Sequence, residues 1–428
     1  MNPIAFVYLL SYVLSLLGNS IAAIALPLII LQTTGSVLGA GTVAAATAVP
    51  AVLAGLLMGV VIDRFNRLTS SVVTDVVSAL SIAALPLVAL ATDLTVGWFV
   101  LFGVIGSLGD IPGMTAREAL LPAIVRESGM SAERLIGLRE SLGAIALVLG
   151  PAIAGTLIGV LEGTTVLWVT AATSLVAALL TLFLPRRVGV ITPEALSSTP
   201  RGLGWIQLRE GWTTLFRNPF LVAVTVIGTV LGVVLASLQG LVLPVYFSTT
   251  DQGTLLGFVL SALAAGLLFG SAIYAIAARR TGRRVWLVLG LVGTAAGLVV
   301  IATLASALTI FVGAFVVGPA SGMFSSVIGV ATLERIPESL RGRVIGTQNA
   351  IATAAPALGI MGAAVLTESF SITVAAIVLA SVWVVTAVVS LCVRSLRTAE
   401  LSAGAIDPVA SSARDIAPGS SATRVKSR

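Results

Sequence analysis

Four carboxylic acids lie within or at the ends of long apolar segments of the chain: Asp75, Asp110, Glu118 and Glu140. A charged side chain inside a bilayer is costly, and acids found there often bind and release protons. We expect Asp110 and Glu140 to lie deepest and to be the proton-binding groups. In the alternative interpretation, both acids form structural ion pairs. Arg117 or Arg139 would then neutralise Asp110. Arg134 would neutralise Glu140.

Several kinds of chemistry are excluded by residues that the chain lacks. It contains no histidine and a single cysteine, Cys392. A histidine or cysteine metal cluster, a disulfide or a Ser/His pair therefore cannot be assembled. The sequence also lacks a nucleotide-binding loop of the form GxxxxGK followed by Ser or Thr, so we do not expect ATP to be its direct energy source. We predict a protein that is not an enzyme and has no metal or cofactor.

The composition indicates a protein embedded in a membrane. Of its 428 residues 57% are hydrophobic and 10% are charged. Soluble domains carry about 25% charged residues because their surfaces face water. The net charge of +6 is therefore not read as a nucleic-acid-binding surface. We expect most of the surface to face lipid.

Counting apolar segments between polar breaks predicts twelve membrane-spanning helices and an all-α fold. Each is long enough for the roughly 20 residues that cross a bilayer, and none alternates like a barrel strand. The predicted spans are 4–31, 38–62, 69–91, 95–116, 135–161, 164–184, 219–247, 254–278, 285–304, 307–332, 344–367 and 370–394.

The charges between these segments predict the orientation. All 24 Lys and Arg residues fall on the side that the count of twelve assigns to both termini. The opposite loops carry only the acids Asp93, Glu162, Asp251 and Glu368. Because basic residues concentrate in cytoplasmic loops, both termini are predicted to be cytoplasmic. Arginine greatly outnumbers lysine, which suggests a GC-rich bacterial genome and hence a bacterial cell membrane.

The chain divides into two related halves. Pro27 matches Pro244, and the segments around Gly150 and Gly359 align without gaps. Paired six-helix halves are typical of secondary transporters. We predict an N-terminal six-helix bundle over 1–185, a cytoplasmic linker with an interfacial amphipathic helix over 186–218, a C-terminal six-helix bundle over 219–395 and a disordered cytoplasmic tail over 396–428.

The loop after the second predicted helix resembles the cytoplasmic loop signature of the major facilitator superfamily. It carries Gly59, Asp63, Arg64 and Arg67, with Asn66 where the family usually has glycine. The resemblance implies that Asp63 faces the N-terminus of helix eleven and favours the outward-open state. It also implies that Arg67 contacts an acid at the inner end of helix four, for which Glu118 is the first candidate and Asp110 the second. The alternative is a polar turn with no role in gating.

The fifth predicted helix carries small residues and a proline at Gly137, Gly150, Pro151 and Gly155. Their spacing resembles the antiporter signature of the same superfamily, which is associated with export. Small residues allow close helix contact, and a proline within a helix removes a backbone hydrogen bond. The alternative is a seam that serves packing alone.

Residues 4 to 394 as a whole resemble the macrolide-exporter branch of the drug antiporters, a pattern shared with siderophore exporters and lysophospholipid transporters. The resemblance implies a monomer that exports a hydrophobic or amphipathic small molecule, with protons and membrane lipid as partners and no nucleic acid. The alternatives are a siderophore or lysophospholipid exporter, a uniporter, or a membrane sensor without transport. Polar and large side chains predicted to face the substrate cavity are Asn19, Gln32, Gln239, Tyr246, Met323, Phe324, Gln348 and Asn349.

Overall fold

A computed structural model describes residues 2–62, 66–161, 163–189, 212–213, 215–278, 281–336 and 338–392. Twelve helices in these ranges are long and apolar enough to cross a membrane, which confirms the predicted fold class. The spans are α1 (Pro3–Thr34), α2 (Val37–Ile62), α3 (Arg67–Ala89), α4 (Val96–Ser128), α5 (Ala132–Val160), α6 (Gly163–Leu182), the joined seventh span α9–η2–α10 (Pro219–Ser237, Leu238–Val242 and Leu243–Thr249), α11 (Gly253–Ala277), α12 (Arg283–Ala302), α13 (Ala307–Arg335), α14 (Glu338–Ser369) and α15 (Ile372–Cys392).

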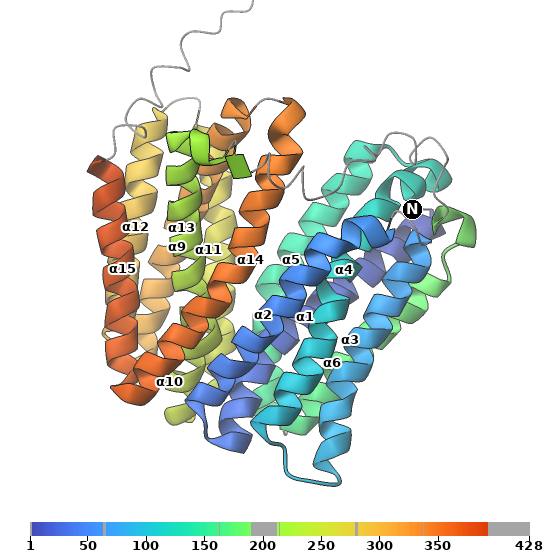
Figure 1. The fold of residues 1–428 in the computed structure, drawn as a ribbon, viewed down its shortest axis with the longest axis horizontal. Coiled ribbons are helices and arrows are strands. Elements are labelled where there is room, and N and C mark those ends of the chain that lie inside the picture. Colours follow the sequence, from blue (N-terminus) through green and yellow to red (C-terminus); the bar gives the residue numbers. More distant parts are fainter. Residues whose placement is uncertain are drawn as a thin grey trace, which may run out of the picture.

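The helices form two bundles, α1–α6 and α9–α15, which meet at one end and diverge toward the other (Figure 1). Helices are required because the backbone groups of each span must be hydrogen-bonded within the lipid. The two bundles repeat the same local design. α1 and α9 both begin with an Asn-Pro pair, and the side chains of Asn2 and Asn218 accept hydrogen bonds from the first backbone amides.

The repeat extends to helix packing. Gly150 of α5 lies against Ser20 of α1, and its counterpart Gly359 of α14 lies against Ser237 in the seventh span. In each bundle a glycine of the fifth helix therefore admits a serine of the first helix at the same place. This agreement supports the internal alignment that the sequence suggested.

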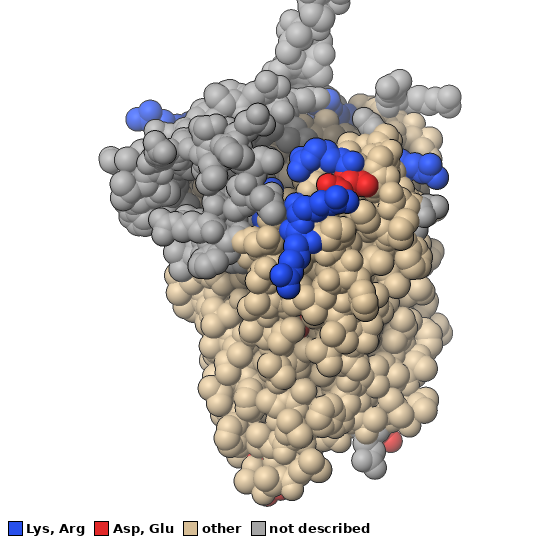
Figure 2. Space-filling model, turned by 90° about the vertical axis from the view of Figure 1, so that its right-hand side faces the viewer, with Lys and Arg blue, Asp and Glu red and all other residues tan. Residues whose placement is uncertain are grey.

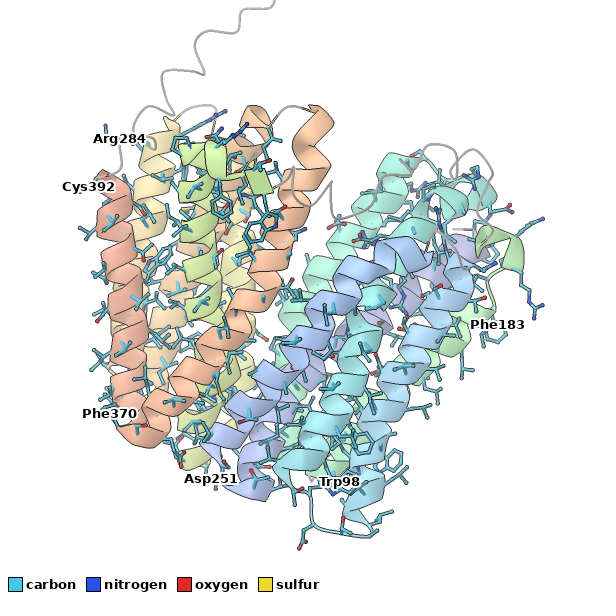
Figure 3. The ribbon with its side chains drawn as sticks, viewed as in Figure 1. Trp98, Phe183, Asp251, Arg284, Phe370 and Cys392 are labelled. Carbon is cyan, nitrogen blue, oxygen red and sulfur yellow. The ribbon has the colours of Figure 1, made fainter. Side chains whose placement is uncertain are left out.

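The ends of the molecule differ in charge. We call the side that holds the N-terminus and the end of α15 the terminal side, and the other the opposite side (Figure 1). On the face shown in Figure 2 the basic residues gather toward the terminal end. Figure 3 places Arg284 and Cys392 on the terminal side and Asp251 and Phe370 on the opposite side. The charge sorting read from the sequence is thus present in the fold.

Helix ends on the terminal side extend further than the sequence predicted. α4 continues to Ser128, twelve residues beyond the predicted end at 116, and α14 begins at Glu338 and not at 344. The charged residues that end the apolar segment do not end the helix, because Arg and Glu are good helix formers. Asp110 consequently lies at the middle of α4 and not near its inner end.

Candidate functional site

The bundles touch on the opposite side through glycines. A Cβ added to Gly155 of α5 would lie 2.6 Å from the carbonyl oxygen of Thr254 and 2.9 Å from the Cα of Gly257, both on α11. Gly257 in turn lies against the backbone of Pro151. Two of the residues predicted for the antiporter-like motif, Pro151 and Gly155, therefore form a backbone-to-backbone contact between the bundles.

A second contact joins α2 and α14 and opens toward the terminal side. Near the start of α2, Gly41 lies against Ala364 and Met361 of α14. Further along the same two helices, a cavity of about 320 Å³ separates Ala51 from Thr353. The bundles are thus closed on the opposite side and splayed toward the terminal side, as the diverging ribbons in Figure 1 indicate.

A second cavity of about 380 Å³ lies inside the N-terminal bundle, and we call it the bundle pocket. It reaches from mid-helix residues of α1 and α4 toward the helix ends on the opposite side, where Ile30, Leu85 and Phe99 line it. Among the described residues, Gly240 of the π-helical turn η2 and Ile360 of α14 are those of the C-terminal bundle that line it. The cavity between α2 and α14, which we call the interbundle cavity, adjoins it.

Asp110 stands at the junction of the two cavities. It lines both of them, together with Thr47 and Ser107. Its Oδ1 accepts a hydrogen bond of 2.5 Å from Ser78, and within the described ranges its carboxylate has no cationic partner. The alternative pairing with Arg117 or Arg139 is therefore not found. An acid without a fixed counter-charge next to an accessible cavity can exchange a proton or meet a charged ligand.

Glu140 lies in a different setting. It is in the third turn of α5, its side chain is 67% exposed, and its Oε1 lies 3.2 Å from Arg139. Its partner is thus Arg139 and not Arg134. The same guanidinium lies 3.1 Å from Glu118 and 4.6 Å over the ring of Tyr12. The expectation that Glu140 shares the depth of Asp110 is not met, since it belongs to an ion-pair cluster near the start of its helix.

A buried ion pair that the sequence reading did not identify links α3 and α4. Asp75 pairs with Arg117, with side chains 7% and 4% exposed. Ser15 donates to Asp75, Arg117 donates to Ser11, and the hydroxyl of Tyr8 donates to the backbone oxygen of Arg117. A buried charge pair is stable only when such additional hydrogen bonds are made. The sequence placed Asp75 within an apolar segment, but it did not indicate that this acid of α3 faces Arg117 on α4.

Replacing Asp75 with Ala is expected to lower the free energy of unfolding by about 3–5 kcal/mol, because Arg117 would remain buried without its partner. Equilibrium unfolding in mixed micelles with increasing SDS measures this change. Glu127→Ala is the matched control, since it removes the exposed pair with Arg187, of 2.9 Å, at an expected cost of about 0–1 kcal/mol. Equal losses in the two variants would contradict a structural role for the buried pair.

The predicted gate loop is described only in part. Asp63 and Arg64 lie outside the described residues, and only the helical backbone of α2 is described at Gly59. Arg67 donates to the backbone oxygen of Ala119 and does not contact Glu118, which faces Arg139 on α5. Adjacent residues of a helix point about 100° apart, so the arginine reaches α4 one residue further along.

Asn66, which replaces the family's usual glycine, has a local function in the structure. Its side chain caps α3 by accepting hydrogen bonds from the backbone amides of Leu68 and Thr69. Asparagine is one of the preferred residues at this position of a helix. The departure from the family pattern is therefore compatible with an intact start of α3.

The other residues of the helix-five motif have separate surroundings. Gly150 packs inside its own bundle, where an added Cβ would lie 2.9 Å from the hydroxyl of Ser20. At Gly137, nothing in the described part of the chain beyond the adjoining residues and backbone of its own helix lies within 4 Å of an added Cβ. The motif thus combines an interbundle contact at Gly155, an intrabundle contact at Gly150 and an unpacked glycine at Gly137.

Of the eight predicted cavity residues, Asn19 lines the bundle pocket and the other seven line neither of the two cavities. Phe324 is 1% exposed and packs edge to face on Trp383, and Met323 packs partly buried beside it. The side chain of Gln348 donates a hydrogen bond of 2.7 Å to the hydroxyl of Thr225. The remaining four are exposed or partly exposed: Gln32, Gln239, Tyr246 and Asn349.

Comparisons with known proteins agree with this geometry. A family model described as Major Facilitator Superfamily matches residues 8–253 and 225–414. The multidrug efflux pump Tap of Mycolicibacterium fortuitum is 31% identical over 355 residues, covering 82% of this chain and 86% of the relative. Macrolide efflux protein A of Streptococcus pyogenes is 24% identical over 267 residues, covering 60% of this chain and 64% of the relative. The crystal structure of the nucleoside transporter NupG has a TM-score of 0.71 at 16% identity, covering 95% of this chain and 100% of that one.

Two six-helix bundles that meet on one side and leave a cavity between them, together with the family match, define a multi-pass membrane transporter and not an enzyme. The chain belongs to the Major Facilitator Superfamily. Its resemblance to the macrolide-exporter branch, read from the sequence, is confirmed by its relatives among drug-efflux proteins.

Proposed function

We propose that this protein exports hydrophobic or amphipathic small molecules in exchange for protons, by alternating access of one cavity to the two sides of the membrane. The observation that carries the proposal is Asp110, an acid without a cationic partner in the described ranges, at the wall shared by two largely apolar cavities. A proton and a substrate can use the same space there in turn, which is the requirement for exchange.

The orientation and the state of the molecule follow from the same proposal. Basic residues favour the cytoplasmic side, so the terminal side faces the cytoplasm of a bacterial cell. The splayed bundles then represent an inward-open state, in which substrate enters from the cytoplasm or the inner leaflet. Asp63, Arg64 and Gly59 remain proposed as the gate that closes this side. The protein is proposed to work as a monomer.

The relatives favour export over uptake. Proteins named for multidrug and macrolide efflux align with this chain, and Pro151 and Gly155 of the antiporter-like motif form its closed contact. Among the described residues that line the two cavities, Asp110 is the one charged side chain, and most of the others are apolar. Such walls suit an apolar or amphipathic molecule better than a sugar or a phosphate. Siderophores and lysophospholipids stay as the competing substrates within the same fold.

Transport into proteoliposomes tests the proposal. With an acidic lumen and a neutral bath, the protein is expected to accumulate the amphipathic dye ethidium inside, and a proton ionophore is expected to abolish the accumulation. Protein-free liposomes supply the background. Uptake that only equalises the dye across the membrane, with or without the pH difference, would establish a uniporter and overturn proton exchange.

A further inference from the structure

The bundle pocket belongs almost entirely to one bundle. Nineteen of its twenty-one lining residues come from α1 to α4, and only Gly240 and Ile360 come from the other half. In alternating access the bundles move largely as rigid bodies. The pocket therefore keeps its shape through the cycle, whereas the interbundle cavity, which α2, α4 and α14 share, must change when the bundles rock.

The walls of the pocket at its end nearer the opposite side are apolar and partly aromatic. Phe99 is buried, and Phe102 stacks on Trp98 at a ring distance of 5.8 Å, which fixes its orientation. Leu85 and Ile30 complete this end. Flat aromatic walls favour flat ring systems over flexible chains, because rings stack on them and lose little conformational freedom.

The other end of the pocket offers hydrogen-bond acceptors. The hydroxyls of Thr47, Ser81 and Ser107 already donate to carbonyl oxygens of their own helices, so they have only acceptor capacity left. The Asp110 carboxylate, when ionised, only accepts. The side chain of Asn19 also lines the pocket, and no described residue hydrogen-bonds to its amide. A ligand that satisfies this end must itself carry donors.

The size of the pocket limits the ligand. Its volume of about 380 Å³ lies in the lower part of the 300–1,000 Å³ range typical of small-molecule sites. At the usual packing density of protein interiors, such a space holds a body of roughly three or four fused rings. Larger substrates would have to extend past Asp110 into the interbundle cavity.

We propose that the bundle pocket is a binding subsite for a compact fused-ring body that carries a hydrogen-bond-donating amine. The rings occupy the space against Phe99 and Phe102, and the amine faces Asp110 and Asn19. This inference rests on the proposed export function for its biological meaning. It assigns the substrate class by chemistry and places recognition within the N-terminal bundle.

Site-directed protection from alkylation tests the location. Cys392 is replaced with Ser, and single cysteines are introduced by Ala23→Cys, which lines the pocket, or by Val49→Cys, which is 64% exposed and lines neither cavity. The probe is 9-aminoacridine, a three-ring amine. It is expected to slow alkylation by N-ethylmaleimide about tenfold at Ala23→Cys and to leave Val49→Cys within about twofold. Equal protection at both positions, or none at either, would overturn the subsite.

Two further comparisons test the chemistry and guard against a misfolded variant. Acridine has the same rings without the amine and is expected to need about tenfold higher concentration for the same protection. Ala44→Phe fills the pocket from α2 and is expected to weaken 9-aminoacridine binding about tenfold. Val49→Phe adds the same ring outside the pocket and is expected to change the affinity for 9-aminoacridine by no more than about twofold. Equal affinities for acridine and 9-aminoacridine would overturn the role of the amine.

Failure of the binding subsite and failure of the proposed export function would give different experimental results. Protection of Ala23→Cys needs no pH difference, so it can succeed even if proton-driven accumulation fails in proteoliposomes. Conversely, proton-driven accumulation of ethidium without protection of Ala23→Cys by 9-aminoacridine would keep the exporter and remove the subsite.

Discussion

Proteoliposomes that contain Asp110→Asn are expected to lose uphill accumulation of ethidium completely while keeping downhill exchange of the dye. The amide has nearly the size and shape of the protonated acid and can still meet Ser78, so the bundles can continue to rock. It cannot take up or release a proton, so the pH difference no longer drives transport. Accumulation ratios with an acidic lumen, and counterflow without a gradient, measure the two activities.

Glu140→Gln is the matched control for this experiment. Glu140 is the other predicted proton-binding acid, but its side chain is 67% exposed and paired with Arg139. We expect this variant to keep at least about half of the uphill accumulation, because Glu140 lines neither cavity and pairing with an arginine favours the charged form of a carboxylate. If Asp110→Asn accumulates dye normally and Glu140→Gln does not, the coupling site lies in the Arg139 cluster.

Gly155→Leu is expected to abolish transport and to hold the bundles apart on the opposite side. Its side chain would enter the space occupied by the backbone of Thr254 and Gly257, which cannot give way as a flexible side chain can. Spin labels at the ends of α5 and α11 that lie on the opposite side of the molecule should then report longer distances between the bundles than in the unmodified protein. Retained transport together with unchanged distances would show that this contact is not required for closure.

Two other glycines of α5 serve as controls. Gly137→Leu enters open space and is expected to leave transport and distances unchanged. Gly150→Leu strikes Ser20 within the same bundle, so it is expected to impair transport and lower the unfolding temperature without lengthening the distance between the bundles. The three variants separate interbundle closure from packing within the N-terminal bundle.

The number of helices and their pairing into halves could be predicted because long apolar segments and one-sided charges leave few arrangements. The ends of the helices could not be predicted, since α4 continues through a charged segment up to Ser128. The prediction that Asp110 and Glu140 share a depth failed for this reason, because depth depends on where each helix begins and ends.

Partners across helices were harder to predict than the helices themselves. Arg117 was one of two arginines considered as partners of Asp110, but Asp110 accepts a hydrogen bond from Ser78 of α3, and Arg117 pairs with Asp75 of the same helix. Among the polar residues proposed for the cavity, Asn19 and Gln348 look equivalent in the sequence. Only the fold shows that the first lines the bundle pocket and the second is hydrogen-bonded to Thr225.

The closed side of the molecule is made from uncharged contacts, at Gly41 with Ala364 and at Gly155 with Gly257. Ion pairs such as Asp75 with Arg117 and Arg139 with Glu118 lie in the half of the N-terminal bundle nearer the terminal side. Dissolved salt screens Coulomb attraction between exposed charges but leaves van der Waals packing almost unaffected. With the terminal side in the cytoplasm, as proposed, the contacts that close the outer side would hold equally well at low and high external salt, whereas the ion pairs lie toward the side whose ionic strength the cell regulates.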